Sequence, residues 1–354
     1  MHDLPGPLIL FGSGETSENG RKAFDWLFDR LKPPIRVAIL ETPAGFEPNS
    51  DRVAGRIGVF LRQRLQNYSL EINLVPARKR GTAYSPDDPK HAEQVLAADC
   101  IFIGPGSPTY AVRQLRESVL WDAVRVRHAS GIPLVLASAS VLAISRHTLP
   151  VYEIYKAGAE LRWESGLDLL GPAGLSIAFL PHWNNQEGGR ELDTSRCFMG
   201  EERFATLQKQ LPRDSTVVGI DEHTALVLHP RENTGFVLGQ GSATVQRSGE
   251  TTRFRTGTSF PLSDFADLNW TALTHTSPAS LVERAHELEH ERDEAEQTSH
   301  VVPDEVLNLV EQRQAARGRR EWAVADELRA RIGQLGYQVQ DTPHGPQVTP
   351  IPET

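Results

Sequence analysis

Three residue types that together form a catalytic serine site each follow a short apolar run in this chain. The serine is Ser138, the histidine is His182 and the carboxylate is Glu222, and they follow the apolar runs 132–136, 175–180 and 217–220. In serine hydrolases the hydroxyl attacks, the imidazole takes its proton and the carboxylate orients the imidazole. A lone loop histidine is more often only a hydrogen-bonded residue, but three such residues at three predicted strand ends are a stronger signal. The pattern predicts a nucleophile, a general base and an orienting acid.

The stretch around Ser138 is typical of a strand that turns abruptly into a helix. Residues 131–145, GIPLVLASASVLAIS, contain a buried strand, a turn of small residues and the apolar start of a helix. Such a turn lifts a hydroxyl out of the sheet, and the helix N-terminus behind it offers free N–H groups to a developing oxyanion. The same residues would also suit a small turn with an N-cap and no chemistry.

Short apolar runs alternate with amphipathic segments over the first hundred residues. Strands are predicted over 8–11, 36–40, 70–75 and 100–103, and helices over 21–31, 51–65 and 89–98. This alternation favours the α/β class, with a mostly parallel sheet covered by helices on both faces. Ligands of such sheets gather at the carboxyl ends of the strands, which is where we expect the site residues to meet.

Three predicted strand ends are rich in glycine and small polar residues, at 12–15, 41–45 and 104–109. The first lacks both the third glycine of a dinucleotide motif and the lysine of a P-loop, so we expect no nucleotide site there. The third precedes a predicted helix near Tyr110, so its backbone N–H groups could form part of an oxyanion hole. A β-turn set by Pro105 and Pro108 would explain the same residues without chemistry.

The composition is that of a globular protein with an acidic balance. The 354 residues carry a net charge of −9, which argues against nucleic-acid binding through bulk charge but leaves room for a local basic patch. The two cysteines, Cys100 and Cys197, lie far apart without metal-ligand spacing, so we expect a reducing compartment, no metal and no disulfide scaffold. The start of the chain lacks a signal-peptide pattern and no window is long and apolar enough for a membrane span, which predicts a soluble cytoplasmic protein.

Several segments together resemble the peptidase S51 family, which contains cyanophycinase and the aspartyl dipeptidases. They are ILFGSGE, AILETPAG, FIGPGSPTYAVRQL, PLVLASASVLA, FLPHWNN and GIDEHTALVL, spread over roughly residues 7–245. The resemblance implies a class I glutamine amidotransferase-like α/β fold that needs no cofactor. It also implies Ser138 as nucleophile, His182 as general base and Glu222 as orienting carboxylate. The backbone N–H groups of Gly106 and Ala139 would form the oxyanion hole.

The chain departs from the family pattern at the elbow and after the histidine. Leu136 and Ser140 stand where the elbow usually has glycines, which relieve crowding at a strained turn. Aspartyl dipeptidases take their acid from soon after the nucleophile, which makes Glu153 the alternative to Glu222. Segment 184–204 has no family equivalent that we can assign, and its composition suits a substrate-recognition loop or a solvated insertion equally.

The C-terminal residues resemble a different family. After a highly charged predicted helix at 277–296, two helices are predicted over 304–317 and 321–335, followed by an extended segment over 337–348 with a turn at 341–345. The run VEQRQAARGRREWAVADELRARIGQLGYQVQDTPHGPQVT resembles the C-terminal end of cysteinyl-tRNA synthetases, without the nucleotide-binding motifs or zinc-binding cysteines of a synthetase. This implies a small module that contributes to tRNA binding.

A cluster of arginines is the candidate RNA contact of this module: Arg313, Arg317, Arg319 and Arg320. The alternative is that the module packs on the main domain or on a partner, with these arginines paired to nearby acids.

These observations predict an α/β domain over 1–275, a charged helical linker over 276–302 and a helical module over 303–354. The function they favour is a serine hydrolase of amide or peptide bonds that acts on a small substrate, with tRNA as a further candidate partner. Family precedent points to acidic or isopeptide-type substrates, although no residue of the sequence fixes the specificity pocket. The alternative is a catalytically silent scaffold of the same fold that binds a small ligand, an RNA or a partner.

Overall fold

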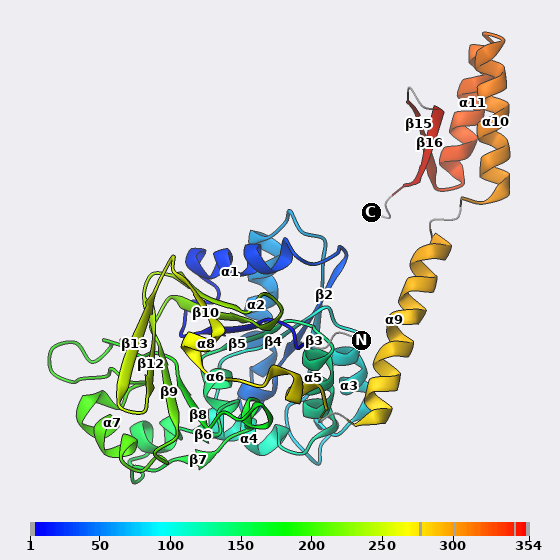
Figure 1. Ribbon diagram of the computed structural model, residues 1–354. Helices are drawn as coiled ribbons and strands as arrows, with labels where there is room; N and C mark the ends of the chain where they lie inside the picture. The colour runs from blue at the N-terminus through cyan, green and yellow to red at the C-terminus, as the bar shows by residue number, and fades with distance from the viewer. Residues whose placement is uncertain (1–3, 276–277, 300–301, 343–344, 352–354) are drawn as a thin grey trace. The chain divides into compact units, whose positions relative to one another are not determined.

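The computed structural model describes residues 4–275, 278–299, 302–342 and 345–351. The chain divides into two compact units, residues 1–286 and residues 287–354, each with a hydrophobic core of its own. Helix α9 (Ala279–Ser299) runs across that boundary and occupies most of the predicted linker (Figure 1).

An eight-stranded sheet forms the centre of the first unit (Figure 1). Its strand order is β14-β11-β10-β1-β5-β4-β2-β3. From β1 to β3 in that order the strands are parallel, whereas β10, β11 and β14 form an antiparallel extension. The bounds are β1 (Leu8–Phe11), β2 (Ile35–Leu40), β3 (Leu70–Val75), β4 (Cys100–Ile103), β5 (Leu134–Ala137), β10 (Thr224–His229), β11 (Thr234–Gly239) and β14 (Ser259–Pro261).

Helices α1 (Glu18–Phe28) and α2 (Ser50–Arg64) cover one face of this sheet. Their apolar residues recur at helical spacing, so each helix buries one stripe against the outward side chains of the strands. The ring of Phe24 lies 5.7 Å from that of Phe11 on β1 and 6.2 Å from that of Phe60 on α2. Helices α3 (Pro89–Leu96) and α5 (Val119–Ala129) pack on each other on the other side of the sheet (Figure 1). The structure therefore confirms the predicted α/β class.

The remaining helices of the first unit are short, and the start of the first of them is set by a proline and a capping serine. Helix α4 (Pro108–Leu115) starts at a proline and is capped by Ser107, whose hydroxyl accepts a hydrogen bond from the Tyr110 N–H at 3.2 Å. The others are α6 (Ala139–Ala143), α7 (Gly200–Gln208), α8 (Leu262–Phe265), η1 (Thr42–Ala44), η2 (Tyr152–Lys156), η3 (Gly171–Ala173), η4 (Pro230–Glu232) and η5 (Trp270–His275).

A second sheet of four strands, in the order β13-β12-β9-β8, lies within the same unit. Strands β8 (Ile177–Leu180) and β9 (Thr216–Ile220) are parallel, whereas β12 (Ser242–Arg247) and β13 (Glu250–Arg255) form an antiparallel hairpin. Two further short strands, β6 (His147–Thr148) and β7 (Glu164–Ser165), pair with each other. Because β8 and β9 are parallel, the residues that follow them emerge at the same edge.

The second unit is a helical pair with a β-hairpin. Helices α10 (Asp304–Gly318) and α11 (Trp322–Gln334) pack together and are followed by β15 (Tyr337–Thr342) and β16 (Gly345–Pro350). This arrangement confirms the predicted C-terminal helical module; residues 343 and 344 of the predicted turn lie outside the described residues. Its core is small: Val306, Leu309, Val310, Ile332 and Val339.

Candidate active site

Ser138 occupies the turn between β5 and α6 in a strained backbone conformation. Its φ of 53° and ψ of −110° lie outside the regions that a side-chain-bearing residue normally adopts. The conformation is held because the Ser138 N–H donates to the Phe11 carbonyl on β1 at 3.2 Å. Strain held by surrounding structure is typical of functional sites, and this geometry is that of a nucleophile elbow.

Ser140 fastens this turn in place of the usual glycine. Its hydroxyl donates to the Ile103 carbonyl on β4 at 2.5 Å and accepts from the Ala137 N–H at 2.9 Å. The other departure, Leu136, is fully buried in β5 opposite Leu10 of β1 and Ile103 of β4. The elbow therefore forms without either glycine.

The structure brings Ser138, His182 and Glu222 together from three strand ends. The Ser138 Oγ lies 2.9 Å from the His182 Nε2, and the His182 Nδ1 lies 2.9 Å from the Glu222 Oε1. A carboxylate only accepts hydrogen bonds, so the imidazole hydrogen belongs on Nδ1 and Nε2 is left to accept the serine hydroxyl. The His182 and Glu222 side chains are 17% and 25% exposed, which leaves the relay open to a ligand yet mostly shielded from water.

Two asparagines hold the triad carboxylate. The Asn185 side-chain amide donates to the Glu222 Oε1 at 2.8 Å, and the Glu222 N–H donates to the Asn184 Oδ1 at 2.7 Å. The hydrogen bond from His182 is the main cause that lowers the pKa of the Glu222 carboxyl, and the one from Asn185 acts in the same direction. Glu222 is therefore ionised at neutral pH.

The backbone N–H groups of Gly106 and Ala139 are free donors beside Ser138. Both residues line the same cavity as Ser138, and within the described residues neither N–H donates to another group. Gly106 has a φ of 149°, and a Cβ there would lie 2.1 Å from the Pro43 carbonyl oxygen, so only glycine fits. Free N–H donors beside a nucleophile are the groups from which an oxyanion hole is built.

The alternative acid, Glu153, forms its hydrogen bond with Thr109 and not with His182. It lies on η2, and its Oε1 accepts from the Thr109 hydroxyl at 2.5 Å. The second carboxylate oxygen of Glu153 is buried with no hydrogen-bond partner among the described residues. The structure pairs His182 with Glu222 and not with Glu153.

A cavity of about 380 Å³ opens beside the triad. Its apolar wall comes from α6, from η2 and from the segment that follows His182, and consists of Leu142, Val151, Tyr152, Tyr155, Cys197 and Phe198. Burial raises the pKa of the Cys197 thiol, which keeps it protonated and unreactive. Two charged side chains, Lys156 and Glu187, complete the cavity lining.

Segment 184–204, which the sequence left open as a recognition loop or a solvated insertion, supplies part of this wall in an unusual backbone conformation. Arg196, Cys197 and Phe198 have φ values of 56°, 60° and 68°, a run of three left-handed residues without glycine. The Cys197 N–H donates to the His182 carbonyl at 3.1 Å, and the Phe198 ring lies 5.4 Å from the imidazole. Segment 184–204 is therefore part of the site and not only a solvated insertion.

Sequence reasoning also missed Glu15, which follows the glycine turn after β1. Burial raises the pKa of its carboxyl, while the charges of His182 and His223 act in the opposite direction. No local signal separates this glutamate from an ordinary turn residue, because its burial depends on chain segments far away in the sequence.

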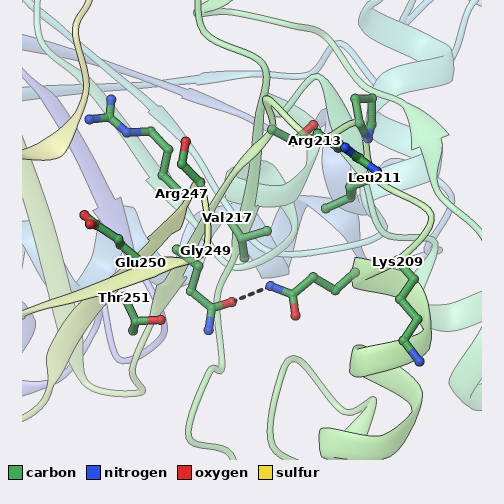
Figure 2. A pocket seen from close by; sticks show the side chains of 13 residues that line it. Lys209, Leu211, Arg213, Val217, Arg247, Gly249, Glu250 and Thr251 are labelled. Carbon is green, nitrogen blue, oxygen red and sulfur yellow. Dashed lines mark hydrogen bonds between the residues drawn. The ribbon is translucent and has the colours of Figure 1, made fainter.

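A larger hollow of about 520 Å³ lies elsewhere on the first unit, between the end of α7 and the β12–β13 hairpin. Figure 2 shows Lys209, Arg213 and Arg247 around it, with Glu250 nearby and a hydrogen bond between Gln208 and Gln246. None of the described residues that line it forms a nucleophile–base pair like that of Ser138 and His182. Its character is that of an open, mostly basic surface.

In the second unit the four candidate arginines have different surroundings. Arg313 is 3% exposed and makes two hydrogen bonds of 2.8 Å to the Asp341 carboxylate, so it is a structural residue of the module. Arg317 lies 3.3 Å from the same carboxylate, and Arg319 pairs with Glu321 at 3.0 Å. Arg317, Arg319 and Arg320 are exposed, and the Arg317 guanidinium lies 5.7 Å from the exposed Trp322 ring.

Among the residues that the structure describes, no three His, Cys, Asp or Glu side chains gather as metal ligands would. No helix within the described ranges is long and apolar enough to cross a membrane.

Comparisons with known proteins give a separate relative for each unit. Residues 299–348 match the family of the cysteinyl-tRNA ligase anticodon binding domain. The chain is 45% identical over 53 residues to the cysteine–tRNA ligase of Methanosarcina acetivorans, which covers 15% of this chain and 11% of that ligase. It is 47% identical over 47 residues to the ligase of Chlamydia felis, covering 13% and 10%. The chain thus spans about a tenth of the length of these curated relatives.

The first unit is similar in fold to a solved structure. A peptidase from an acI-B1 Actinobacterium aligns with a TM-score of 0.58 and 24% identity, over 73% of this chain and 98% of that chain. At this identity the alignment shows the fold, and it confirms the predicted peptidase-like architecture. The chain therefore joins a peptidase-like α/β fold to a segment related to the anticodon-binding domain of cysteinyl-tRNA ligases.

Proposed function

We propose that the first unit is a serine hydrolase of amide or peptide bonds, of the type found in the S51 family. The observation that carries this proposal is the relay of two 2.9 Å contacts from Ser138 through His182 to Glu222, at the edge of a cavity. The peptidase-like fold supports it further.

The mechanism follows from the protonation states of the relay. The Ser138 hydroxyl attacks the substrate carbonyl while His182 Nε2 takes its proton, and the tetrahedral oxyanion accepts hydrogen bonds from the Gly106 and Ala139 N–H groups. His182 then returns the proton to the leaving amine, which breaks the C–N bond and leaves an acyl ester on Ser138. A water molecule then attacks the ester carbonyl and gives a proton to His182, which passes it to the Ser138 Oγ as the C–O bond breaks and the acid product leaves. Glu222 stabilises the imidazolium in both steps.

A fluorophosphonate probe tests the nucleophile without knowledge of the substrate. We expect covalent labelling of the full-length protein that disappears in Ser138→Ala and persists in Ser69→Ala, an exposed serine on the same unit. Absence of labelling in folded wild-type protein would favour the alternative, a catalytically silent binding scaffold of the same fold.

We further propose that the second unit contacts tRNA, since the anticodon-binding domain it matches does so in the ligases. The contacting residues in this proposal are Arg317, Arg319 and Arg320, which are exposed. Arg313 is left out because it is buried against Asp341. With a net charge of −9 the chain repels a polyanion at long range, so binding should be modest and sensitive to salt.

Fluorescence anisotropy with total tRNA at low salt tests this contact. Changing Arg317, Arg319 and Arg320 together to Ala should abolish binding. The control removes the same charge from the hollow of Figure 2, by changing Lys209, Arg213 and Arg247 to Ala, and should leave binding intact. Loss of binding in the control alone would place the RNA on the first unit, and no shift at tens of micromolar protein (about the non-specific range) would refute the contact.

A further inference from the structure

The cavity beside Ser138 has two features that the hydrolytic mechanism does not use. One is the carboxylate of Glu187, and the other is the aromatic wall formed by Tyr152, Tyr155 and Phe198. Both line the cavity that also contains the nucleophile and the base, so a substrate attacked by Ser138 would lie beside them.

We propose that this cavity selects an aminoacyl group, with its free α-ammonium bound by Glu187 and an apolar side chain packed against the aromatic wall. This inference rests on the proposed hydrolase function and narrows its substrate class. It differs from the acidic substrates that the family resemblance implies.

Glu187 is available for a cationic ligand. Its side chain is exposed and lines the cavity, and within the described part of the chain its carboxylate takes part in no ion pair or hydrogen bond. Its backbone is nevertheless fixed, because the Glu187 N–H donates to the Asn185 Oδ1 at 3.1 Å. An unpaired carboxylate on a held backbone, beside a nucleophile, is suited to bind an ammonium group.

Asn185 links this carboxylate to the catalytic relay. Asn185 is 1% exposed. Its amide NH₂ donates to the Glu222 carboxylate, and its side-chain Oδ1 accepts from the Glu187 backbone N–H. The hydroxyl of Thr194, also 1% exposed, accepts from the Gly188 N–H at 3.1 Å and closes the loop behind Glu187. The amine-binding position and the triad are therefore held by the same buried side chain.

The aromatic wall begins at the base and continues away from it. The Phe198 ring lies 5.4 Å from the His182 imidazole, and also 5.4 Å from the Tyr155 ring. An acyl side chain that leaves the scissile carbonyl toward this wall buries apolar surface, at roughly 25 cal/mol per Å² removed from water. The wall therefore favours an apolar or aromatic side chain over a small one.

Lys156 contributes to the orientation of the substrate. Its ammonium lies 5.5 Å from the Tyr155 ring centroid, and its side chain is exposed and lines the cavity. A cation at this position repels the substrate α-ammonium and directs it to Glu187. It would also attract an acidic side chain, which makes an aspartyl group the rival occupant in the test.

Isothermal titration calorimetry on the full-length Ser138→Ala protein at pH 7 measures this selectivity without turnover. The probes are L-phenylalaninamide, N-acetyl-L-phenylalaninamide, L-alaninamide and the α-amide of L-aspartate. L-phenylalaninamide should bind about two- to fivefold more tightly than its N-acetyl form, as for one exposed ion pair. L-alaninamide and the aspartate amide should both bind more weakly than L-phenylalaninamide.

A second substitution in the same background assigns the effect to one carboxylate. Glu187→Gln should abolish the preference for the free amine and leave N-acetyl-L-phenylalaninamide binding unchanged, whereas Glu191→Gln, an exposed acid of the same loop outside the cavity lining, should change neither. Equal binding of the two phenylalanine amides, no binding of any probe, or a preference for the aspartate amide would overturn the inference. Fluorophosphonate labelling of the wild type is read separately, so failure of this selectivity is distinguishable from failure of the hydrolase function.

Discussion

At the scale of single residues, the site is defined by which carboxylate faces the imidazole. Sequence reasoning left two acids open, and the geometry separates them. Glu222 lies 2.9 Å from the His182 Nδ1, while Glu153 bonds the Thr109 hydroxyl. An orienting acid acts by fixing the imidazole tautomer, so only the acid in contact with Nδ1 can have this role.

Glu222→Gln should therefore slow the reaction of Ser138 with a fluorophosphonate by about a thousandfold or more, as expected when a triad carboxylate becomes an amide. The matched change Glu153→Gln should leave the labelling rate within about threefold, because its partner is a hydroxyl. Rates are measured by stopped aliquots on gels with a fluorescent probe. A large loss in Glu153→Gln with none in Glu222→Gln would reverse the assignment.

The lowered pKa of Glu222 makes a prediction about stability as well. A carboxyl whose pKa is lower in the folded state than in the unfolded chain stabilises the fold above its unfolded value, here 4.5, and loses that contribution as the pH falls through the folded pKa. The difference in unfolding free energy between wild type and Glu222→Gln should be constant near neutral pH and shrink in acid. Urea denaturation at a series of pH values measures it, and a difference that grows toward acid would contradict this cause.

At the scale of elements, the elbow depends on how β5, α6 and β4 are joined. The Ser140 hydroxyl connects these elements, because it accepts a hydrogen bond from the Ala137 N–H and donates one to the Ile103 carbonyl. The glycine that usually stands here relieves crowding but makes no such bonds. In this chain the serine is therefore part of the turn's construction.

Ser140→Gly should destabilise the protein although it restores the usual elbow residue. It leaves the buried Ala137 N–H without an acceptor, at a cost of about 1–3 kcal/mol. Ser140→Ala should cost a similar amount, whereas Ser130→Ala, on a half-buried serine at the end of α5, should cost less. Chemical denaturation gives the values. A Ser140→Gly protein more stable than wild type would show that crowding outweighs the hydrogen bonds.

Some helices and strands could be located from the sequence, and others could not. The strands β1 to β5 and the helices α1, α2 and α3 follow local hydrophobic periodicity, so their positions were accessible, whereas α5 was not predicted. The apolar runs of β8 and β9 were also visible, but their pairing in a sheet of their own and the pairing of β10 with β1 were not, because these pairings join segments far apart in the chain. The left-handed run at Arg196, Cys197 and Phe198 was inaccessible for a similar reason, because surrounding packing and not residue type imposes it.

The surroundings of charged side chains could not be predicted from the sequence either. The arginine cluster of the module was visible in the sequence, but the burial of Arg313 against Asp341 requires the fold of the hairpin. Glu187 had no distinguishing signal either, since an exposed acid in a polar loop is ordinary. The triad residues were accessible because each follows a recognisable strand.

At the scale of the whole molecule, the two units have separate cores and separate candidate functions. The triad of Ser138, His182 and Glu222 and the cavity beside it lie within residues 1–286, and α9 begins in that unit. The Arg284 side chain on α9 pairs with Glu93 of α3 at 2.9 Å, so the first turns of this helix belong to the first unit. The module should therefore be removable if α9 is kept.

A chain that ends at Ser299 should label with a fluorophosphonate at the wild-type rate, within about twofold, because the described residues that line the cavity all belong to the first unit. Its main thermal transition should stay within a few degrees, while tRNA binding measured by anisotropy should be lost. Ser138→Ala in the shortened chain is the control for specific labelling. A shortened protein that stays folded but no longer labels would mean that the module completes the active site, and tRNA binding that survives the truncation would assign the RNA to the first unit.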